Sequence, residues 1–362
     1  MDNYEKLRQL LDKSAVGAPA SKSFYEILKI LFTQEEVEIA LFLTFKLSDV
    51  DTIAQKTGVE KDKIFELCES MADKGIIFSS SKNGIFRYAL SPTIPGLFEF
   101  PLMKGAKDET KKRLGKLWME YHHESQLKEF TSSKTPFARI LPLEQTVAPG
   151  NETLPYEIIS KMMGLNRTFS VAECACRVAS GEDACDKPKN VCLMFDSTAE
   201  FLIERKIAKK ITREEALEIV LKSEKEGLVH TTNNSKDRLT FICNCCPCCC
   251  TVLVGQTKLN SKNPFAKSSW IASVNKDACT GCGICKTERC PVEAILVYDE
   301  KADVNDSLCI GCGLCSSTCP EDAISMISRS NYEKTPETAG EMMQNIMKEK
   351  GKLKDYTDFN KS

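Results

Sequence analysis

The chain has 362 residues, of which 42% are hydrophobic and 28% are charged, and its formal net charge is −2 at pH 7. This length allows two or three domains, and the near-neutral charge favours neither a nucleic-acid binder nor a membrane-surface protein. No stretch approaches about eighteen consecutive apolar residues, and the first residues lack the apolar core of a signal peptide, so we expect a cytoplasmic protein without membrane insertion.

Cysteine is the outlier in the composition. There are 19 cysteines, an odd number, and all except Cys68 lie between Cys174 and Cys319. A reducing cytoplasm disfavours structural disulfides, so clustered thiols indicate metal ligands rather than a disulfide scaffold. Cys68 stands at an apolar helix position and is expected to be a small buried hydrophobic residue.

Residues 21–100 carry no metal signature and are predicted to form one domain. Apolar periodicity, capping signals and stop glycines predict helices over residues 26–32, 33–45, 49–58 and 59–74. A hairpin is predicted over residues 76–90, around a Ser-Ser-Lys-Asn-Gly turn. Helix–turn–helix followed by a hairpin resembles a winged helix.

The charge of the last of these helices argues against DNA binding. It would be the recognition helix of a winged helix. Its acidic residues are Glu60, Asp62, Glu66, Glu69 and Asp73, and its basic residues are Lys61, Lys63 and Lys74. Because phosphate contacts supply most DNA affinity, this net negative face would repel a duplex. We therefore expect the domain to dock on a protein or on a second copy of the chain, and we do not expect nucleic acid as a partner.

Residues 101–155 are predicted to be a helical and extended connector. A helix of mixed charge is expected over residues 107–130, and four prolines break the stretch that follows. His122 and His123 have no partner at a metal-binding spacing, so these histidines and His230 are expected to be solvated or packed.

Residues 156–265 are predicted to form a Cys-rich α+β domain with two groups of cysteines. The first group has the spacing C-x-C-x8-C-x6-C and consists of Cys174, Cys176, Cys185 and Cys192. Four cysteines are the number of ligands that one [4Fe-4S] cubane or one zinc ion takes. Arg177 either offsets the charge of ligated thiolates or is a surface arginine. Helices over residues 198–209 and 212–226 and strands over residues 228–231 and 238–242 connect this group to the second.

The second group is the stretch CNCCPCCC. Its cysteines are Cys243, Cys245, Cys246, Cys248, Cys249 and Cys250. Because side chains alternate along an extended chain, Cys243 and Cys245 would share one face, and Cys246 would share the other with Cys248 and Cys250. Pro247 introduces a bend. The stretch is then expected to serve two clusters or one larger, non-standard cluster. Soft-metal storage also fits the count, but it does not explain the motif that follows.

Residues 266–330 contain the most specific metal-binding motifs of the sequence. CTGCGICKTERCPVEAI, at 279–295, and CIGCGLCSSTCPEDAI, at 309–324, each read C-x2-C-x2-C, a spacer, Cys-Pro, an acidic residue and Ala-Ile. The second spacer has the usual three residues and the first has four, a difference that a local bulge can absorb. Glycines between the cysteines suit a loop that wraps a cluster at close range. Zinc is the alternative, but it does not call for three cysteines in tandem before Cys-Pro, twice.

Residues 268–328 resemble a bacterial two-cluster ferredoxin. This resemblance implies two [4Fe-4S] clusters with crossed ligation, in which the cysteine before proline serves the other cluster. The first cluster is then assigned Cys279, Cys282, Cys285 and Cys319, and the second Cys309, Cys312, Cys315 and Cys290.

Residues 150–325 as a whole resemble a family of anaerobic iron–sulfur proteins that carry the C-x-C-R and CNCCPCCC pair ahead of a dicluster ferredoxin tail. The resemblance implies iron–sulfur binding but no particular reaction. Residues 331–362 are polar and Lys-rich and are predicted to be a flexible tail, with a possible helix over residues 336–350 that docks on a partner.

The expected fold class is therefore an α+β multidomain protein. No nucleotide, nicotinamide or flavin motif is present, and no catalytic residue is indicated. We expect an electron-transfer protein with two [4Fe-4S] clusters and one or two further clusters in the middle domain. Its expected partner is a redox protein or an oxidoreductase complex, with a homodimer through the winged helix as a further possibility. Two alternatives stay open: a redox-responsive DNA-binding regulator, and a reductase whose cluster at CNCCPCCC binds substrate.

Overall fold

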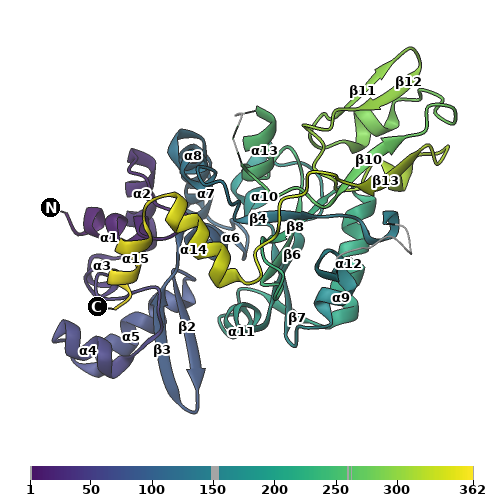
Figure 1. The fold of residues 1–362 in the computed structure, drawn as a ribbon. Helices are drawn as coiled ribbons and strands as arrows, with labels where there is room; N and C mark the ends of the chain where they lie inside the picture. The colour runs from purple at the N-terminus through teal and green to yellow at the C-terminus, as the bar shows by residue number, and fades with distance from the viewer. Residues whose placement is uncertain (1, 148–154, 259–260, 262, 362) are drawn as a thin grey trace.

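The computed structural model describes residues 2–147, 155–258, 261 and 263–361. It is a mixed α/β protein built from several units with small sheets. Figure 1 shows an N-terminal helical unit, a larger central sheet, and a C-terminal unit made of the strands β10 to β13.

The N-terminal unit contains the predicted hairpin and four predicted helices, but it begins with a further helix at Asn3–Asp12 that the sequence did not predict. The predicted helix over residues 33–45 ends earlier, at Ala40. Its helices are α1 (Asn3–Asp12), α2 (Lys22–Leu31), α3 (Gln34–Ala40), α4 (Val50–Thr57) and α5 (Lys61–Asp73). The strands β1 (Ser48–Asp49), β2 (Ile77–Lys82) and β3 (Ile85–Leu90) form a sheet in the order β1-β3-β2. The capping box of Thr33 and Glu36 is present at the start of α3, and Gly58 ends α4 with φ +72°. The description of this unit as a winged helix stays a prediction.

The connector contains more regular structure than the sequence predicts. The π-turn η1 (Thr93–Leu97) and α6 (Glu99–Leu102) precede α7 (Glu109–Tyr121), the π-turn η2 (His122–Gln126) and α8 (Leu127–Phe130). The strand β4 (Ala138–Leu141) then pairs with β8 of the central sheet. Part of the predicted connector is therefore an edge strand of the middle domain, because its apolar residues Ile140 and Leu141 are buried there.

The central sheet has six strands, all antiparallel, in the order β4-β8-β9-β6-β5-β7. Its other strands are β5 (Phe169–Glu173), β6 (Asn190–Phe195), β7 (Lys209–Ile211), β8 (Val229–Asn233) and β9 (Phe241–Cys245). The helices of this domain are α9 (Ile159–Met163), α10 (Ala175–Ala179), α11 (Asp196–Glu204), α12 (Arg213–Lys225) and α13 (Thr251–Lys258). The predicted helix over residues 198–209 ends earlier, because residues 209–211 pair with β5 as an edge strand.

Side-chain alternation gives the sheet two different faces. Leu193 and Ile242 pack with residues of α9 and α12 in one apolar core. Their neighbours Cys192, Met194 and Phe241 point the other way, into the core shared with the N-terminal unit. The face of the sheet that carries Cys192 is therefore the face that the N-terminal unit covers.

The N-terminal unit packs directly on the middle domain. Phe201 of α11 contacts Phe78 of β2, with ring centroids 4.8 Å apart. The buried Arg205 forms ion pairs with Glu69 at 2.7 Å and Asp73 at 3.0 Å, both on α5. Two of the acidic residues of the predicted recognition helix are thus bound within the chain.

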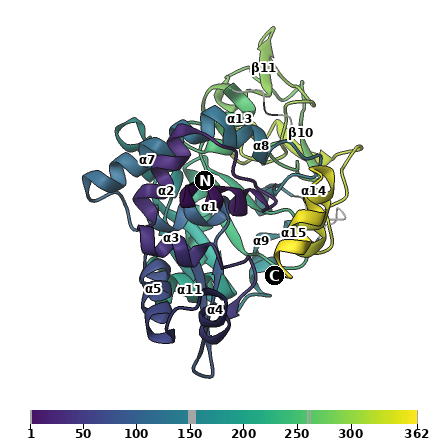
Figure 2. The same cartoon turned by 90° about the vertical axis from the view of Figure 1, so that its left-hand side faces the viewer.

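The C-terminal unit consists of two small two-stranded antiparallel sheets, and two final helices follow it in the chain. Strands β10 (Trp270–Val274) and β13 (Ile324–Ser328) pair with each other, as do β11 (Ile295–Tyr298) and β12 (Lys301–Val304). The final helices are α14 (Ala339–Glu349) and α15 (Leu353–Phe359). Figures 1 and 2 show both helices lying back against the N-terminal unit, so that the two ends of the chain lie on the same unit.

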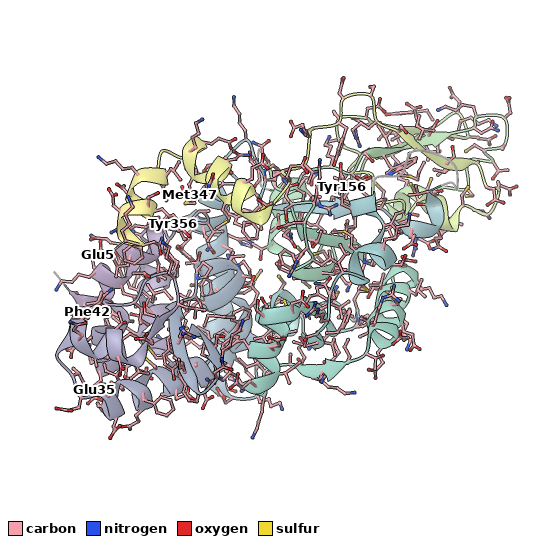
Figure 3. The ribbon with its side chains drawn as sticks, turned by 60° about the horizontal axis from the view of Figure 1, so that its bottom comes forward. Glu5, Glu35, Phe42, Tyr156, Met347 and Tyr356 are labelled. Carbon is pink, nitrogen blue, oxygen red and sulfur yellow. The ribbon has the colours of Figure 1, made fainter. Side chains whose placement is uncertain are left out.

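These final helices differ from the flexible tail that the sequence predicts for residues 331–362. Met342, Ile346 and Met347 form an apolar stripe on α14 and are buried with Ala15. Figure 3 shows Met347 and Tyr356 on these helices beside the N-terminal unit. The predicted helix therefore exists, but it docks within the chain. In the described part of the chain, no helix is long and apolar enough to cross a membrane.

Candidate metal centres

The cysteines of residues 279–319 line two separate cavities. One cavity is lined by Cys279, Cys282, Cys285 and Cys319, and the other by Cys290, Cys309, Cys312 and Cys315. The space between the atoms is about 350 Å³ in the first and about 330 Å³ in the second. These are the two sets that crossed ligation predicts, and the ligation itself stays a prediction.

The extra residue of the first motif is taken up by a wider turn. Residues Cys285–Arg289 form a π-turn, in which the Cys290 amide donates to the carbonyl of Cys285 at 3.0 Å. In the second motif a tighter 3₁₀ turn occupies Ser316–Thr318. The two spacers differ in length, yet both bring the cysteine before proline to its cavity.

Glycine is required where these loops pass close to the rest of the chain. Gly281 has φ +72°, and a Cβ there would collide with the backbone of Glu300. Gly311 has φ +75°, and a Cβ there would collide with the carbonyl of Trp270. Both positions therefore need the missing side chain as well as the left-handed backbone.

Backbone amides point at the cysteine sulfurs of both sites. The amides of Ala302, Ala294 and Ala323 donate to sulfurs in the two sites. The Ala302 amide lies 3.4 Å from the Cys279 sulfur and is the main cause of a lowered pKa of that thiol. Hydrogen bonds of this kind stabilise thiolate and tune the potential of a bound cluster.

The two dicluster sites differ in their exposure to solvent. Cys282 of the first site is exposed. In the second site, Cys309, Cys312 and Cys315 are all buried. Burial raises the pKa of the Cys312 thiol to about 12. The Leu143 amide donates to the Cys312 carbonyl at 3.0 Å, so the second site is the one that packs against the middle domain.

Six cysteines of the middle domain form a closed ring. The members are, in order around the ring, Cys174, Cys176, Cys250, Cys245, Cys243 and Cys192. Each sulfur interacts with its two neighbours in this order, and the last returns to the first. The neighbours Cys243 and Cys250 lower the pKa of the Cys245 thiol to about 6, so the ring already favours thiolate at that position.

The central sheet and two helix starts build this ring. Cys243 and Cys245 alternate with Ile242 and Asn244 on β9, so both point to the same face, as the sequence predicts. Cys192 joins them from the neighbouring strand β6. Cys174 and Cys176, at the start of α10, and Cys250, just before α13, complete the ring.

The ring opens on a cavity that is much larger than the dicluster cavities. The space between its atoms is about 880 Å³. Its other lining residues are mainly apolar and aromatic, including Phe98, Phe130 and Phe265. Glu99 also lines the cavity, and the Gly96 amide donates to its carboxylate at 2.8 Å. Burial raises the pKa of Glu99 to about 7, and Cys174 adds to this effect.

The remaining four middle-domain cysteines form a second group. These are Cys185, Cys246, Cys248 and Cys249, and their sulfurs all lie within 4.8 Å of one another. Cys185 therefore lies apart from Cys174, Cys176 and Cys192, with which its spacing had grouped it. Cys250 lies in the ring rather than with Cys246 and Cys248, because its amide bonds to the Cys246 carbonyl at 3.2 Å in a turn, and the chain is not extended there.

Arg177 lies between the two groups. Its guanidinium is completely buried, which excludes the surface position that the sequence left open. It donates to the carbonyls of Pro188 and Asn244. Burial alone lowers the pKa of Arg177, but the thiolates of Cys174 and Cys246 outweigh it and raise the pKa. A fixed positive charge thus faces both cysteine groups.

The ring and the second dicluster cavity share one apolar core. Cys245, Cys250 and Leu253 belong to the same buried cluster as Cys312 and Leu314. Arg289, in the π-turn of the first motif, donates to carbonyls at the end of α12. The dicluster domain is therefore packed and hydrogen-bonded to the domain that carries the ring.

Comparisons with known proteins agree with this geometry. Residues 271–320 match the family model of the 4Fe-4S dicluster domain. A search of curated proteins found no match to the chain. The chain thus contains an iron–sulfur domain of the electron-transfer type, and the match does not extend to the ring or to the N-terminal unit.

The sequence did not indicate Glu99 or the buried environment of His230. Glu99 reaches the cavity because α6 packs against α10, a contact between segments about 75 residues apart in the chain. His230 is buried, and its Nδ1 lies 2.6 Å from Asn244 Oδ1. His122 is buried against Phe98 and Trp118. Of the two environments that the sequence left open for these histidines, solvated or packed, His122 and His230 have the packed one.

Proposed function

We propose that the chain is an iron–sulfur electron-transfer protein in which the dicluster domain and a larger iron–sulfur centre at the six-cysteine ring act together. It would serve as a component or partner of an oxidoreductase. The match of residues 271–320 to the 4Fe-4S dicluster domain supports the first part. The single observation that carries the second part is the ring of six thiols around one large cavity.

The chemistry of the ring fits a cluster larger than a cubane. A [4Fe-4S] cluster takes four thiolates, whereas six converge here. The space lined by the ring and its neighbouring residues, open mouth included, is about 880 Å³, against about 350 Å³ at a dicluster site of four cysteines. When bound, such clusters supply one-electron redox chemistry, and the protein supplies position, charge and access.

The different exposure of the two dicluster sites indicates which of them a redox partner would approach. Cys282 at the first dicluster site is the exposed cysteine of that domain, so a redox partner would approach there. Cysteines of both dicluster sites share one buried cluster with the ring members Cys245 and Cys250. The second site also contacts the middle domain directly, because the Leu143 amide donates to the Cys312 carbonyl. Arg177 is fully buried and lines the ring cavity together with apolar side chains, so it would offset the negative charge of a cluster held there.

The N-terminal unit is proposed to be a docking unit. Its helix α5 already pairs with the middle domain through Glu69, Asp73 and Arg205. In a DNA-binding regulator, α5 would be the helix that contacts DNA. Two of its side chains are instead paired with Arg205 within the chain, so these ion pairs give the alternative of a DNA-binding regulator no support.

The test is the iron and acid-labile sulfide content of full-length protein purified without oxygen. Two cubanes give roughly eight of each per chain, so a larger ring centre predicts a count well above eight. The variant Cys192→Ser should lower the count to about eight, because it removes a ring member and leaves the dicluster sites intact. The matched control Cys68→Ala removes a buried cysteine outside all sites and should keep the full count. A wild-type count near eight would refute the ring centre and leave the dicluster domain standing.

One observation also favours the reductase alternative. Glu99 places a carboxyl group, with a pKa of about 7, in a mainly apolar cavity beside the ring, which Arg177 also lines. A group of this kind can hold a proton for a bound substrate near neutral pH. Cyanide, as a small ligand of iron, should change the electron spin resonance signal of the ring centre if one iron is open, and Glu99→Gln should alter that change. A signal that ignores cyanide would exclude this alternative.

A further inference from the structure

The group of four cysteines has the dimensions of a single-metal site. The Cys185 sulfur lies 3.7 Å from that of Cys246, and the Cys249 sulfur lies 3.8 Å from Cys185 and 3.7 Å from Cys248. Sulfurs placed at the corners of a tetrahedron, each about 2.3 Å from a central metal, are about 3.8 Å apart. These three separations match that edge length, and every pair of the four sulfurs lies within 4.8 Å.

The same separations do not suit a cubane. The four thiolates of a cubane bind four different irons, so the width of the cluster holds their sulfurs apart. Within the described ranges of the chain, the four-cysteine group is the one set of three or more potential ligands whose atoms all lie within 4.8 Å. The cysteines of the two dicluster sites and of the ring are more widely spaced, so the structure itself distinguishes the two kinds of site.

We propose that Cys185, Cys246, Cys248 and Cys249 bind one zinc ion in a closed tetrahedral site. Four thiolates without a further ligand position are typical of structural zinc. Cys246 and Cys249 also have the C-x2-C spacing that such sites use. The site is separate from the ring, so this inference does not depend on the proposed electron-transfer function.

Local structure brings the four sulfurs together. Pro247 follows Cys246 at the start of a turn, which places three thiols on one side of the chain. Cys185 comes from the loop before β6, and its amide points at the Cys249 sulfur at 3.5 Å. Cys246 and Cys249 are buried against Leu228, whereas Cys248 is exposed. The site thus lies at the surface with its inner half sealed.

The zinc ion would join the two segments that carry the ring. Cys185 lies in the chain between the ring members Cys176 and Cys192. The turn of residues 246–249 lies between the ring members Cys245 and Cys250. Each segment contributes three cysteines to the ring, so a metal that ties the two loops together fixes the spacing of the ring sulfurs.

The experiment measures zinc in the full-length protein, purified anaerobically with its native metals. Elemental analysis should give one zinc ion per chain, and X-ray absorption at the zinc edge should show about four sulfurs at about 2.3 Å. This edge is element-specific, so the irons elsewhere do not obscure it. Cys249→Ser should lose the zinc, whereas Cys290→Ser, which alters a dicluster cysteine, should lower the iron content and keep the zinc.

A second variant separates loss of a ligand from loss of the fold. Cys185→His should retain zinc, with one nitrogen replacing one sulfur at the zinc edge, because histidine is also a zinc ligand. Wild-type protein that lacks stoichiometric zinc, or that carries iron in this site, would overturn the proposal. Full zinc retention in Cys249→Ser would overturn it as well.

Discussion

Replacing Arg205 with methionine tests how the N-terminal unit is held on the middle domain. The side chain of Arg205 is 6% exposed and pairs with Glu69 at 2.7 Å and Asp73 at 3.0 Å. It also donates to the Ser79 hydroxyl of β2. Methionine keeps much of the volume and removes every one of these bonds.

The magnitude follows from the burial of each partner. Breaking a fully buried ion pair costs about 3–5 kcal/mol, but an exposed pair contributes less than about 1 kcal/mol. Glu69 is 27% exposed and Asp73 is 68% exposed, so solvent screens the second pair almost completely. We therefore expect Arg205→Met to cost about 2–3 kcal/mol. This corresponds to a roughly 30- to 150-fold change in the equilibrium constant for separating the two units.

Hydrogen exchange read by mass spectrometry is the assay. Amides of α5 and β2 should lose protection in Arg205→Met by about that factor, if these elements open together. Arg167 on the same domain is exposed, and Arg167→Met should change protection by less than about 0.5 kcal/mol. A double-mutant cycle with Glu69→Gln should give a coupling of at least about 1.5 kcal/mol. A coupling near zero would refute the argument that this pair holds the units together.

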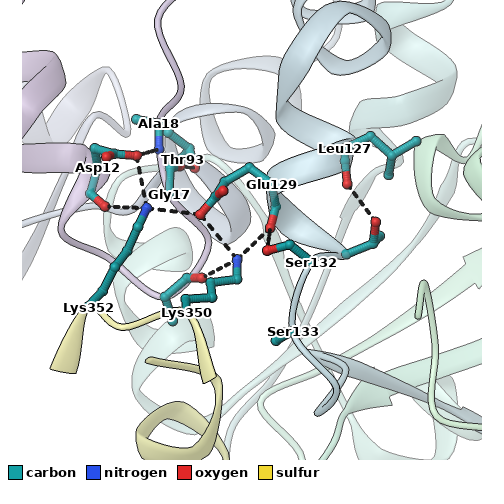
Figure 4. Close-up of polar contacts among 12 residues, drawn as sticks. Asp12, Gly17, Ala18, Thr93, Leu127, Glu129, Ser132, Ser133, Lys350 and Lys352 are labelled. Carbon is teal, nitrogen blue, oxygen red and sulfur yellow. Dashed lines mark hydrogen bonds and ion pairs between the residues drawn. The ribbon is translucent and has the colours of Figure 1, made fainter. Parts of the chain in front are cut away.

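Three further predictions concern pH, the dicluster loops and the C-terminal helices. Burial lowers the pKa of His122 to about 3, so between about pH 6.5 and 3 the unfolded chain binds more protons there than the folded chain. The contribution of His122 to the free energy of unfolding should fall by about 1.6 kcal/mol from pH 6.5 to pH 5, and His122→Leu should reduce the observed fall in urea titrations at both pH values. Gly281→Ala places a Cβ against the backbone of Glu300, so it should lower the iron content by roughly four per chain, measured by elemental analysis. The side chain of Lys350 is 4% exposed and pairs with Glu129 between the C-terminal helices and the rest of the chain (Figure 4). Lys350→Met should destabilise this contact by about 1–3 kcal/mol and speed proteolysis after residue 330.

The glycine and lysine predictions each have a matched control variant. Gly84 has φ +75°, but a Cβ there meets nothing within 4 Å, so Gly84→Ala should keep all iron. Lys348 is exposed on α14, and Lys348→Met should leave the proteolysis rate unchanged. Equal effects of the paired glycine variants, or of the paired lysine variants, would contradict the structural argument. If the free energy of unfolding of His122→Leu depends on pH as strongly as that of the wild type, the argument from the burial of His122 is wrong.

The sequence alone determined the features that depend on short spacing. The tandem motifs predicted the three neighbouring cysteines of each dicluster cavity, whereas the resemblance to a two-cluster ferredoxin supplied the crossed fourth cysteine. The capping box at Thr33 and the stop glycine at Gly58 gave correct helix limits, because these signals act over a few residues. Alternation along an extended segment placed Cys243 and Cys245 on one face.

Only the tertiary structure decided how the ten middle-domain cysteines divide. The ring needs Cys192 of β6 beside Cys243 of β9, a pairing of strands about fifty residues apart. The turn after β9 then moved Cys250 into the ring and left Cys246 to meet Cys185. Spacing along the chain cannot fix such convergence, because strand register and turn type set the directions of the sulfurs. The same holds for the final helices: the sequence predicted a flexible tail with one possible helix, and only the tertiary structure placed Met342, Ile346 and Met347 against Ala15 of the N-terminal unit.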